Sequence, residues 1–225
     1  MDATVCFIIP VLNEAGRIAA LLTGLRARFP GAQLVVVDGG SGDDTVRQAM
    51  RHCDQLLLGQ RGRAAQMNLG AAAAAADYLF FLHADGEPGI DGTRLGIELA
   101  RAPDWGFSRV RLSGRQPHFR VIEWFINRRS RLTHVATGDQ MLFVRRDIFA
   151  QTGGFDDIPL MEDVAYCKRL RALAPPLILS EPVLSSSRRW EEGGVAATVL
   201  RMWALRLAYV LGVSPQRLWR HYYGG

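Results

Sequence analysis

Lysine and cysteine are both scarce in this chain of 225 residues, and each scarcity excludes a class of function. Lys168 is the only lysine, although Lys and Arg together number 27. A P-loop needs a lysine directly after a glycine, whereas Lys168 follows Cys167, so phosphate binding of the P-loop type is excluded. The three cysteines (6, 53 and 167) have neither C-x-x-C nor zinc-site spacing, and their low, odd number favours a reducing compartment.

A basic leader and a long uninterrupted apolar run are also missing, so we expect a cytoplasmic protein. Residues 193–213 are mostly apolar, but Arg201 and Arg206 interrupt them. Two central arginines would each cost about 2.5–3.5 kcal/mol in a membrane span, which argues against one. Two interpretations stay open for this segment: a helix packed on its own domain, or an interfacial helix in peripheral contact with the inner face of the membrane.

Apolar runs suited to buried strands alternate with helical patterns in the first part of the chain. Strands are predicted at 4–10, 32–38, 54–59 and 77–85, and helices at 17–29, 45–52 and 63–76. This alternation predicts βαβ units and a mostly parallel sheet, that is, an α/β fold. Beyond residue 88 we expect a helix at 91–102, a strand at 105–114, helices at 118–132 and 161–173, and a strand, short helix and turn within 140–157.

Acidic residues fall where these predicted strands stop. The run "YLFFLHADGEP" (78–88) suits a strand covered on both faces, yet it ends in His83-Ala84-Asp85 before a glycine and a proline terminate it. Glu14 and Asp38 follow the first two strands, and Asp163 begins a later helix. Each acid alone could be a cap or turn residue. Together they predict a ligand-binding edge, because the carboxyl ends of strands in an open α/β sheet are where ligands bind.

The segment after the second strand favours a mononucleotide. A dinucleotide site is not expected, because the G-x-G-x-x-G pattern is absent after the first strand. Asp38 is placed to accept a hydrogen bond from a base, and Gly39 permits close approach of the backbone. Arg61 and Arg63 precede an alanine-rich helix, and a helix N-terminus beside guanidinium groups suits a diphosphate.

Basic charge is concentrated between residues 109 and 131. Seven arginines lie there (109, 111, 115, 120, 128, 129 and 131) against the single acid Glu123. Such a cluster is compatible with a phosphorylated or otherwise anionic ligand, and equally with a solvated surface of an arginine-rich protein.

Several short motifs, in order, resemble those of glycosyltransferase family 2. They are "IIPVLNE", "VVVDGGSGDDT", "GRAAQMN", "FLHAD", "TGDQMLFVRR", "GGFDD" and "MEDVAYCKRL". Each is weak alone, but their order from about residue 4 to residue 190 is specific. Within the family, the chain is most similar to the compact bacterial group described as selenodomain-associated transferases. The resemblance implies a GT-A fold, a Rossmann-like, mostly parallel mixed sheet flanked by helices, and a nucleotide-diphosphate sugar as donor.

The resemblance also implies roles for individual positions. The donor nucleotide would be bound by Pro10, Asn13, Glu14, Asp38, Gly39, Arg63, Asn68, His83, Ala84, Arg189 and Trp190. The sugar and acceptor would lie near Gly138, Asp139, Gln140 and Glu162. Asp85 would be the metal ligand and Asp163 the catalytic base. An attack by an acceptor hydroxyl that displaces the diphosphate directly inverts the anomeric centre.

His83 departs from the family pattern, because it occupies the first acidic position of the D-x-D motif. Imidazole suits Mn²⁺ better than Mg²⁺, which prefers oxygen ligands. We therefore expect Asp85 and phosphate oxygens to hold a divalent cation, Mn²⁺ or Mg²⁺, while His83 bonds to the ligand.

The expected organisation is a GT-A domain over residues 1–190, with a nucleotide-binding half (1–87) and an acceptor half (88–190). Residues 191–225 form a helical extension packed on the same domain. A UDP-sugar is the favoured donor; the acceptor is an alcohol or a lipid phosphate, and no nucleic-acid partner is expected. Two alternatives stay open: a sugar nucleotidyltransferase, and a non-catalytic protein that binds nucleotide sugars.

Overall fold

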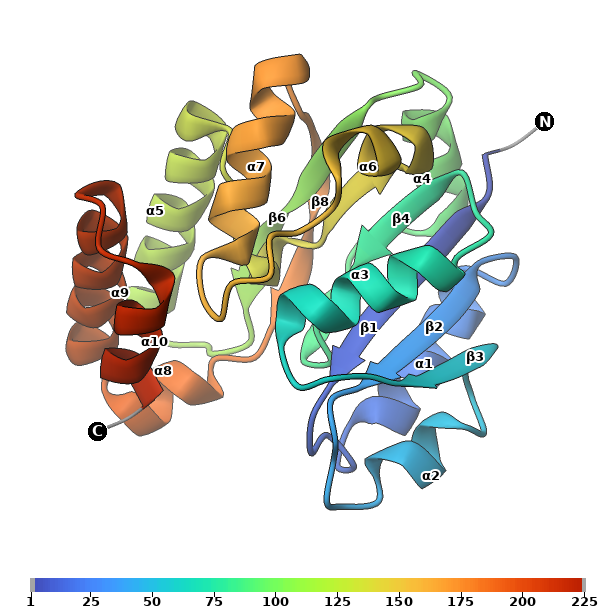
Figure 1. The fold of residues 1–225 in the computed structure, drawn as a ribbon, viewed down its shortest axis with the longest axis horizontal. Helices are drawn as coiled ribbons and strands as arrows, with labels where there is room; N and C mark the ends of the chain where they lie inside the picture. The colour runs from blue at the N-terminus through green and yellow to red at the C-terminus, as the bar shows by residue number, and fades with distance from the viewer. Residues whose placement is uncertain (1–2, 224–225) are drawn as a thin grey trace.

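A computed structural model describes residues 3–223, without the side chains of residues 189, 190, 192, 196 and 223. Within these residues, eight strands form one sheet in the order β3-β2-β1-β4-β7-β6-β8-β5, with helices on both faces (Figure 1). Neighbouring strands are parallel from β3 through β4 and again between β6 and β8, while β7 and β5 are antiparallel to their neighbours. The predicted mostly parallel, mixed α/β sheet is therefore confirmed.

The elements follow the hydrophobic pattern of the sequence closely. The strands are β1 Val5–Val11, β2 Gln33–Asp38, β3 Gln55–Leu58, β4 Tyr78–Phe81, β5 Gly86–Pro88, β6 Trp105–Leu112, β7 Leu142–Arg145 and β8 Leu177–Ser185. The helices are α1 Ile18–Arg28, α2 Thr45–Ala49, α3 Arg63–Ala73, α4 Gly92–Leu99, α5 Pro117–Thr133, α6 Arg146–Thr152, α7 Glu162–Leu173, α8 Arg188–Gly193, α9 Val195–Val210 and α10 Pro215–Tyr223, with a 3₁₀ turn η1 at Gly138–Gln140.

Strand β4 lies inside the sheet and is covered on both faces, as its unbroken apolar run predicts. Its four residues are all buried. Leu79 and Phe81 belong to the core beneath α3, α6 and α7, whereas Tyr78 and Phe80 belong to the core beneath α1, α2 and α4. Because side chains alternate across a strand, one apolar run supplies both cores. The residues that follow β4 are thereby fixed at the edge of the sheet.

Strands β5 and β8 were not predicted. The strand expected to run to residue 85 ends at Phe81, and Gly86–Pro88, expected to terminate it, form β5, which pairs antiparallel with β8. β8 runs parallel to β6, with an irregular register between Ser108 and Val110. Pro182 lies within β8 and obscures it in the sequence, because proline cannot donate to a strand ladder.

The C-terminal helices α8, α9 and α10 lie at the end of the molecule farthest from β3, with α9 beside α5 (Figure 1). Val195, Val199 and Met202 of α9 pack against a small core that contains Phe119 and Ile122 of α5. Among the described residues, none of the helices combines the length and the apolarity that crossing a bilayer requires. The predicted separation of residues 191–225 as an extension stays a prediction.

Strand directions bring distant parts of the chain to one edge of the sheet. The carboxyl ends of the parallel strands β1, β2 and β4 meet there. β7 is antiparallel to β4, so its first residues, preceded by η1, lie at the same edge. β6 is antiparallel to β7 and β8 is parallel to β6, so both strands end at this edge as well. The candidate site is built on these strand ends.

Candidate functional site

The loop after β1 is held rigidly by the loop after β2. Asn13 has a positive φ of 57°, a conformation that asparagine tolerates better than most residues. Its side-chain Oδ1 accepts from the Gly42 N–H (2.9 Å), and its own N–H donates to Ser41 Oγ (2.8 Å). The Glu14 N–H donates to Thr45 Oγ1 (2.7 Å). These bonds leave the side chain of Glu14 half-buried at the edge of the sheet.

Asp38 is buried at the end of β2, with its carboxylate engaged in the turn that follows. Oδ2 accepts from the Gly40 and Ser41 N–H groups, both at 2.9 Å, and Oδ1 accepts from Ser41 Oγ at 2.5 Å. An ionised carboxylate has about four acceptor positions, so one position remains for a ligand donor. The predicted contact with a base therefore stays a prediction, and the turn itself accounts for most of the capacity of Asp38.

Gln66 of α3 closes the bottom of this half-site. Its Nε2 donates to the carbonyls of Val11 (3.0 Å) and Val37 (2.8 Å), which joins the ends of β1 and β2. A β-carbon at Gly39 would approach the Gln66 amide to 3.0 Å. Gly39 thus packs closely against Gln66, and a β-carbon there would require the amide to shift by a few tenths of an ångström. Pro10 lies in β1 opposite Val37 and is half-buried.

Asn68, a predicted donor-binding residue, bonds to the loop before α7. Its Nδ2 donates to the Phe155 carbonyl (2.8 Å), and its Oδ1 accepts from the Phe155 N–H (2.9 Å). Both ends of the amide are engaged with backbone, so Asn68 already has a structural role. Its role toward a donor stays a prediction.

Arg63 is the first residue of α3 and links the two halves of the edge. Its Nη1 lies 3.9 Å from Oε1 of Glu162, at the start of α7. Glu162 is only 5% exposed, and burial together with the neighbouring Asp163 raises the pKa of Glu162 to about 7, against the opposing effect of Arg63. Arg63, Glu162 and Asp163 therefore bring charges of both signs together between the N-termini of α3 and α7.

His83, Gly138 and Asp163 form a continuous chain of contacts. A β-carbon at Gly138 would come within 2.6 Å of the His83 Nε2 position, so the imidazole lies directly against this glycine. The Gly138 N–H donates to Asp163 Oδ2 at 2.9 Å. Asp163 Oδ1 accepts from the Val164 N–H at 2.7 Å. The residue after β4, the turn before β7 and the first turn of α7 therefore meet in one place.

Burial raises the pKa of Asp163, although backbone hydrogen bonds and the cations Arg63 and Arg129 oppose the rise. The position at a helix N-terminus alone would lower the pKa, so burial is the stronger effect here. Arg129 belongs to the basic segment but was not predicted at the site. It is half-buried on α5, burial lowers the pKa of its guanidinium, and Asp163 and Asp139 oppose that change. In the sequence, only the position of Arg129 within the cluster of seven arginines pointed to a role at the site.

Gln140 is fully buried and has a structural role. Its Oε1 accepts from Ser130 Oγ (2.7 Å) and from the Thr137 N–H (3.1 Å), and Thr137 in turn caps η1. It thereby anchors η1 to α5. Asp139, beside it, is half-buried and lies in the electrostatic field of Arg129.

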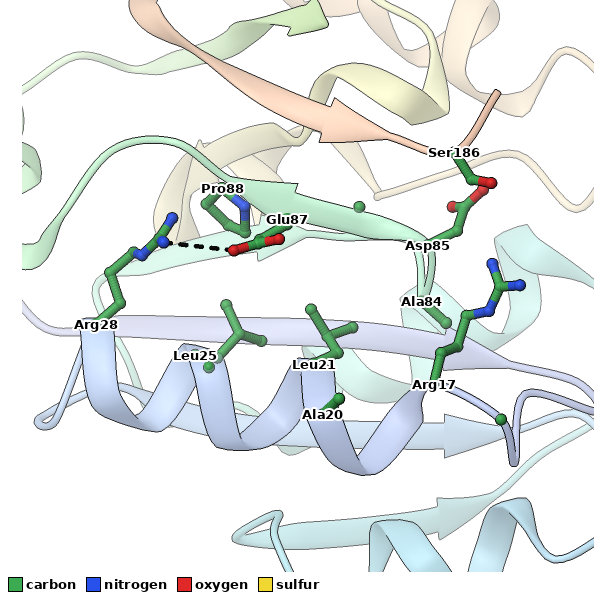
Figure 2. Close-up of a pocket in the computed structure, with 13 residues that line it drawn as sticks. Arg17, Ala20, Leu21, Leu25, Arg28, Ala84, Asp85, Glu87, Pro88 and Ser186 are labelled. Atoms are coloured by element: carbon green, nitrogen blue, oxygen red, sulfur yellow. Dashed lines mark hydrogen bonds and ion pairs between the residues drawn. The ribbon is translucent and has the colours of Figure 1, made fainter. Parts of the chain in front are cut away.

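Asp85 is half-buried and opens onto a cleft of about 460 Å³ between α1 and β5 (Figure 2). Arg17 and Ser186 lie near Asp85 at one end of this cleft, and Arg28, paired with Glu87 at 3.4 Å, lies at the other. Burial raises the pKa of Glu14; Arg17 and Arg188 oppose the rise, while Asp85 adds to it. Glu14 and Asp85 are therefore electrostatic neighbours, as expected for two strand ends at one edge.

Among the described residues, no three His, Cys, Asp or Glu side chains come together as a ready-made metal site. The carboxylate of Asp85 is half-buried, Ala84 is buried and His83 packs on Gly138. A hard cation needs several oxygen ligands. These residues therefore fit a divalent ion that arrives with phosphate oxygens, not one held by protein ligands alone.

The predicted residues divide into those that the structure brings together and those that it places elsewhere. Glu14, Asp38, Arg63, His83, Asp85, Gly138, Asp139, Glu162 and Asp163 lie along one edge. Asn68 and Gln140 support loops beneath it. The predictions for Arg189 and Trp190 fall outside the described side chains.

Residues 6–104 match the family model described as "Glycosyl transferase family 2". An uncharacterised glycosyltransferase of Mycobacterium tuberculosis is 28% identical over 194 residues, which cover 78% of this chain and 72% of that protein. The chain is thus similar to a glycosyltransferase over most of its length.

Two solved structures are similar to the fold. S. aureus TarS 1–349 in complex with UDP has a TM-score of 0.67 and 14% identity, over 81% of this chain and 60% of the other. The mannosyltransferase PcManGT from Pyrobaculum calidifontis, in complex with GDP-Man and Mn²⁺, has a TM-score of 0.64 and 20% identity, over 92% of this chain and 61% of the other. This chain therefore spans about three fifths of the length of these structures, and at such identities the likeness shows the fold alone.

Proposed function

Because residues 6–104 match the glycosyl transferase family 2 model and the chain has the GT-A fold, we propose that it is a glycosyltransferase that moves a sugar from a nucleotide-diphosphate donor, with a UDP-sugar favoured, to an acceptor hydroxyl with inversion. The family match favours sugar transfer over nucleotidyl transfer. Catalysis is favoured over binding alone, because the charged residues that a catalyst needs lie along one edge of the sheet.

The observation that carries this proposal is the contact of His83 with Gly138 and the bond from Gly138 to Asp163. These contacts bring the end of β4, where a diphosphate would bind, next to the carboxylate of Asp163 at the start of α7. A transferase needs this arrangement, because the leaving group and the proton acceptor act on opposite sides of one sugar carbon.

Asp163 is the proposed general base. The acceptor oxygen attacks the anomeric carbon, the bond from that carbon to the diphosphate oxygen breaks, and the hydroxyl proton passes to an Asp163 oxygen. Two backbone N–H groups hold the carboxylate in a fixed orientation. A base with a raised pKa accepts a proton more readily at neutral pH than an ordinary aspartate, and such catalysis typically contributes 10²–10⁴-fold.

The leaving diphosphate is proposed to lie near Arg63 and the N-terminus of α3. Its growing negative charge would be stabilised by the guanidinium and by the N–H groups of the first helical turn. We propose that Asp85 holds a divalent cation together with the phosphate oxygens; when bound, this ion supplies Lewis-acid stabilisation of the leaving group. Asp38 and the Asn13 loop would bind the nucleoside.

The acceptor is proposed to be anionic or carried on a lipid phosphate. Of the seven arginines between 109 and 131, Arg120 is bound to Glu123 (2.9 Å) and to the carbonyls of Leu112 and Gly114. Five others, at 109, 111, 115, 128 and 131, are exposed. They leave ample positive charge for an anionic molecule near the site.

A thermal-shift screen tests the donor side of the proposal. UDP, GDP, CDP and dTDP sugars are compared, each with and without Mn²⁺. A ligand at 100 times its Kd stabilises the native state by about 2.7 kcal/mol, so the true donor should raise the melting temperature clearly. We expect a UDP-sugar to do so, and more strongly with Mn²⁺.

Asp85→Asn should remove the effect of Mn²⁺ on nucleotide binding. Glu87→Gln is the matched control, since Glu87 is an exposed acid two residues away and should leave the effect intact. If the Asp85 variant keeps the full metal dependence, Asp85 is not the ligand. If no nucleotide sugar shifts the melting temperature under any condition, the proposed function itself is wrong.

A further inference from the structure

Helix α9 is apolar on its outer face as well as on its inner face. Its inner residues, including Leu205 and Met202, are buried or half-buried against the domain. Its outward side carries five large apolar residues that stay exposed: Leu200, Trp203, Leu207, Val210 and Leu211. Their spacing of three or four residues places them on one stripe of the helix. Trp203 is 64% exposed and Leu211 74%, which is unusual for such side chains.

Helix α5 presents a second apolar stripe. Val121, Trp124, Phe125 and Leu132 are exposed, with Trp124 at 59%. They too recur at spacings that keep them on one side of the helix. Exposed apolar residues scattered singly need no explanation, but two aligned stripes with two tryptophans and a phenylalanine do.

The two stripes face the same side of the molecule. The helices touch through their early residues, with Phe119, Ile122 and Ile126 of α5 in the same small core as Val195, Val199 and Met202 of α9. The two helices run in the same direction (Figure 1). We call the line of these contacting residues the seam. Around the axis of α5, at about 100° per residue, the apolar stripe lies about 130° from the seam. Around the axis of α9 the stripe lies about 105° from the seam, in the opposite direction of rotation. For parallel helices, opposite senses place both stripes on one side, about 55° apart. We call this surface the α5–α9 face.

Positive charge borders the α5–α9 face. At about 100° per residue, Arg201 lies about 130° from the centre of the α9 stripe, and Arg206 lies about 90° from it on the other side, toward the seam with α5. Arg128 lies within the α5 stripe and Arg131 at its margin, and both are exposed. Residues 195–225 contain four arginines and no acidic residue, and Glu123, the one acid of α5, is buried. Basic residues therefore outnumber acidic ones around the face.

From this combination we infer that the α5–α9 face binds the surface of an anionic lipid bilayer. Aromatic and aliphatic side chains would enter the boundary between headgroups and acyl chains, and the arginines would meet the anionic headgroups. A protein partner with an apolar surface would not by itself require a rim of one sign. Arg129, on the inner side of α5, lies in the electrostatic field of Asp163. Binding through this face would thus leave Arg129 off the lipid-facing stripe of α5.

Co-sedimentation with vesicles tests the inference on the full chain. Vesicles of phosphatidylcholine alone are compared with vesicles that also contain phosphatidylglycerol, at low and high salt. We expect binding to the anionic vesicles only, and weaker binding at high salt. Trp203→Ser with Leu207→Ser should reduce the partition coefficient about tenfold. Arg128→Gln should reduce it about fivefold, the worth of one cation near such a surface.

The matched control is Ile97→Ser with Leu58→Ser, which removes two exposed apolar side chains from α4 and β3 and should leave binding unchanged. Thermal melts of every variant establish that the fold is retained. The inference is wrong if native protein does not sediment with anionic vesicles, or if both double variants lose binding equally. It is also wrong if the native chain is a dimer in solution that Trp203→Ser dissociates, because a second copy would then cover the face. The nucleotide screen is independent of all these outcomes.

Discussion

The backbone N–H of Gly138 donates to Oδ2 of Asp163 over 2.9 Å, which ties the turn before β7 to the first turn of α7. With the second bond from Val164, both carboxylate oxygens are fixed by backbone, so the orientation of Asp163 does not depend on a flexible side-chain partner. The same glycine supports the His83 ring. One residue without a side chain thus positions the candidate base relative to the end of β4.

Asp163→Asn is expected to abolish turnover while the donor still binds. The amide keeps the size of the carboxylate but cannot accept the acceptor proton, so kcat should fall 10²–10⁴-fold. Donor hydrolysis, with water as the acceptor, provides the rate measurement without knowledge of the natural acceptor. Donor affinity is measured separately by titration calorimetry.

The two measurements distinguish a catalytic from a structural role. A catalytic Asp163 predicts a large fall in rate at nearly constant donor Kd and melting temperature. A parallel loss of rate, affinity and stability would instead mean that the carboxylate only anchors Gly138.

Gly138→Ala should impair activity through His83. The added methyl group would overlap the imidazole, so either the ring or the η1 turn must move, and with it the bond to Asp163. A misplacement of about 1 Å can cost a factor of 10² in rate. Gly96→Ala, on an exposed helix position with open space around it, should leave the rate unchanged and raise stability by roughly 0.5–1 kcal/mol. Equal rates for the two variants would contradict the close contact.

The strand ends could be predicted from the sequence because two simple patterns coincide there. The run 78–81 is apolar throughout, which predicts a buried strand, and Asp85 after it cannot be buried without a partner. The same reasoning located Glu14 and Asp38. It could not place β8, because Pro182 interrupts the pattern and the strand is defined mainly by its long-range pairing with β6 and β5.

Side-chain roles that depend on tertiary contacts were less accessible. Asn68 and Gln140 stand in motifs that favour ligand binding, yet each uses its amide to hold a loop through hydrogen bonds to residues outside its own motif. Arg129 is one of seven neighbouring arginines, and only the packing of α5 against the site distinguishes it. Residue type and spacing identify an edge of the sheet with many charged and polar residues. Tertiary packing then decides which of them face a ligand and which support the loops.

Glu162→Gln is expected to stabilise the protein above neutral pH. Burial raises the pKa of Glu162 to about 7, so the folded state holds a proton that the unfolded state, with a pKa near 4.5, releases earlier. Stability is therefore lost as the pH rises from about 4.5 to 7, and the buried charge persists at higher pH. One pKa unit corresponds to about 1.4 kcal/mol, so a rise from 4.5 to about 7 predicts a gain of roughly 3 kcal/mol for glutamine at pH 8 and little at pH 4. Denaturant unfolding at both pH values measures this, with the exposed Glu87→Gln as control. A gain that does not depend on pH would show that Glu162 is not the titrating group.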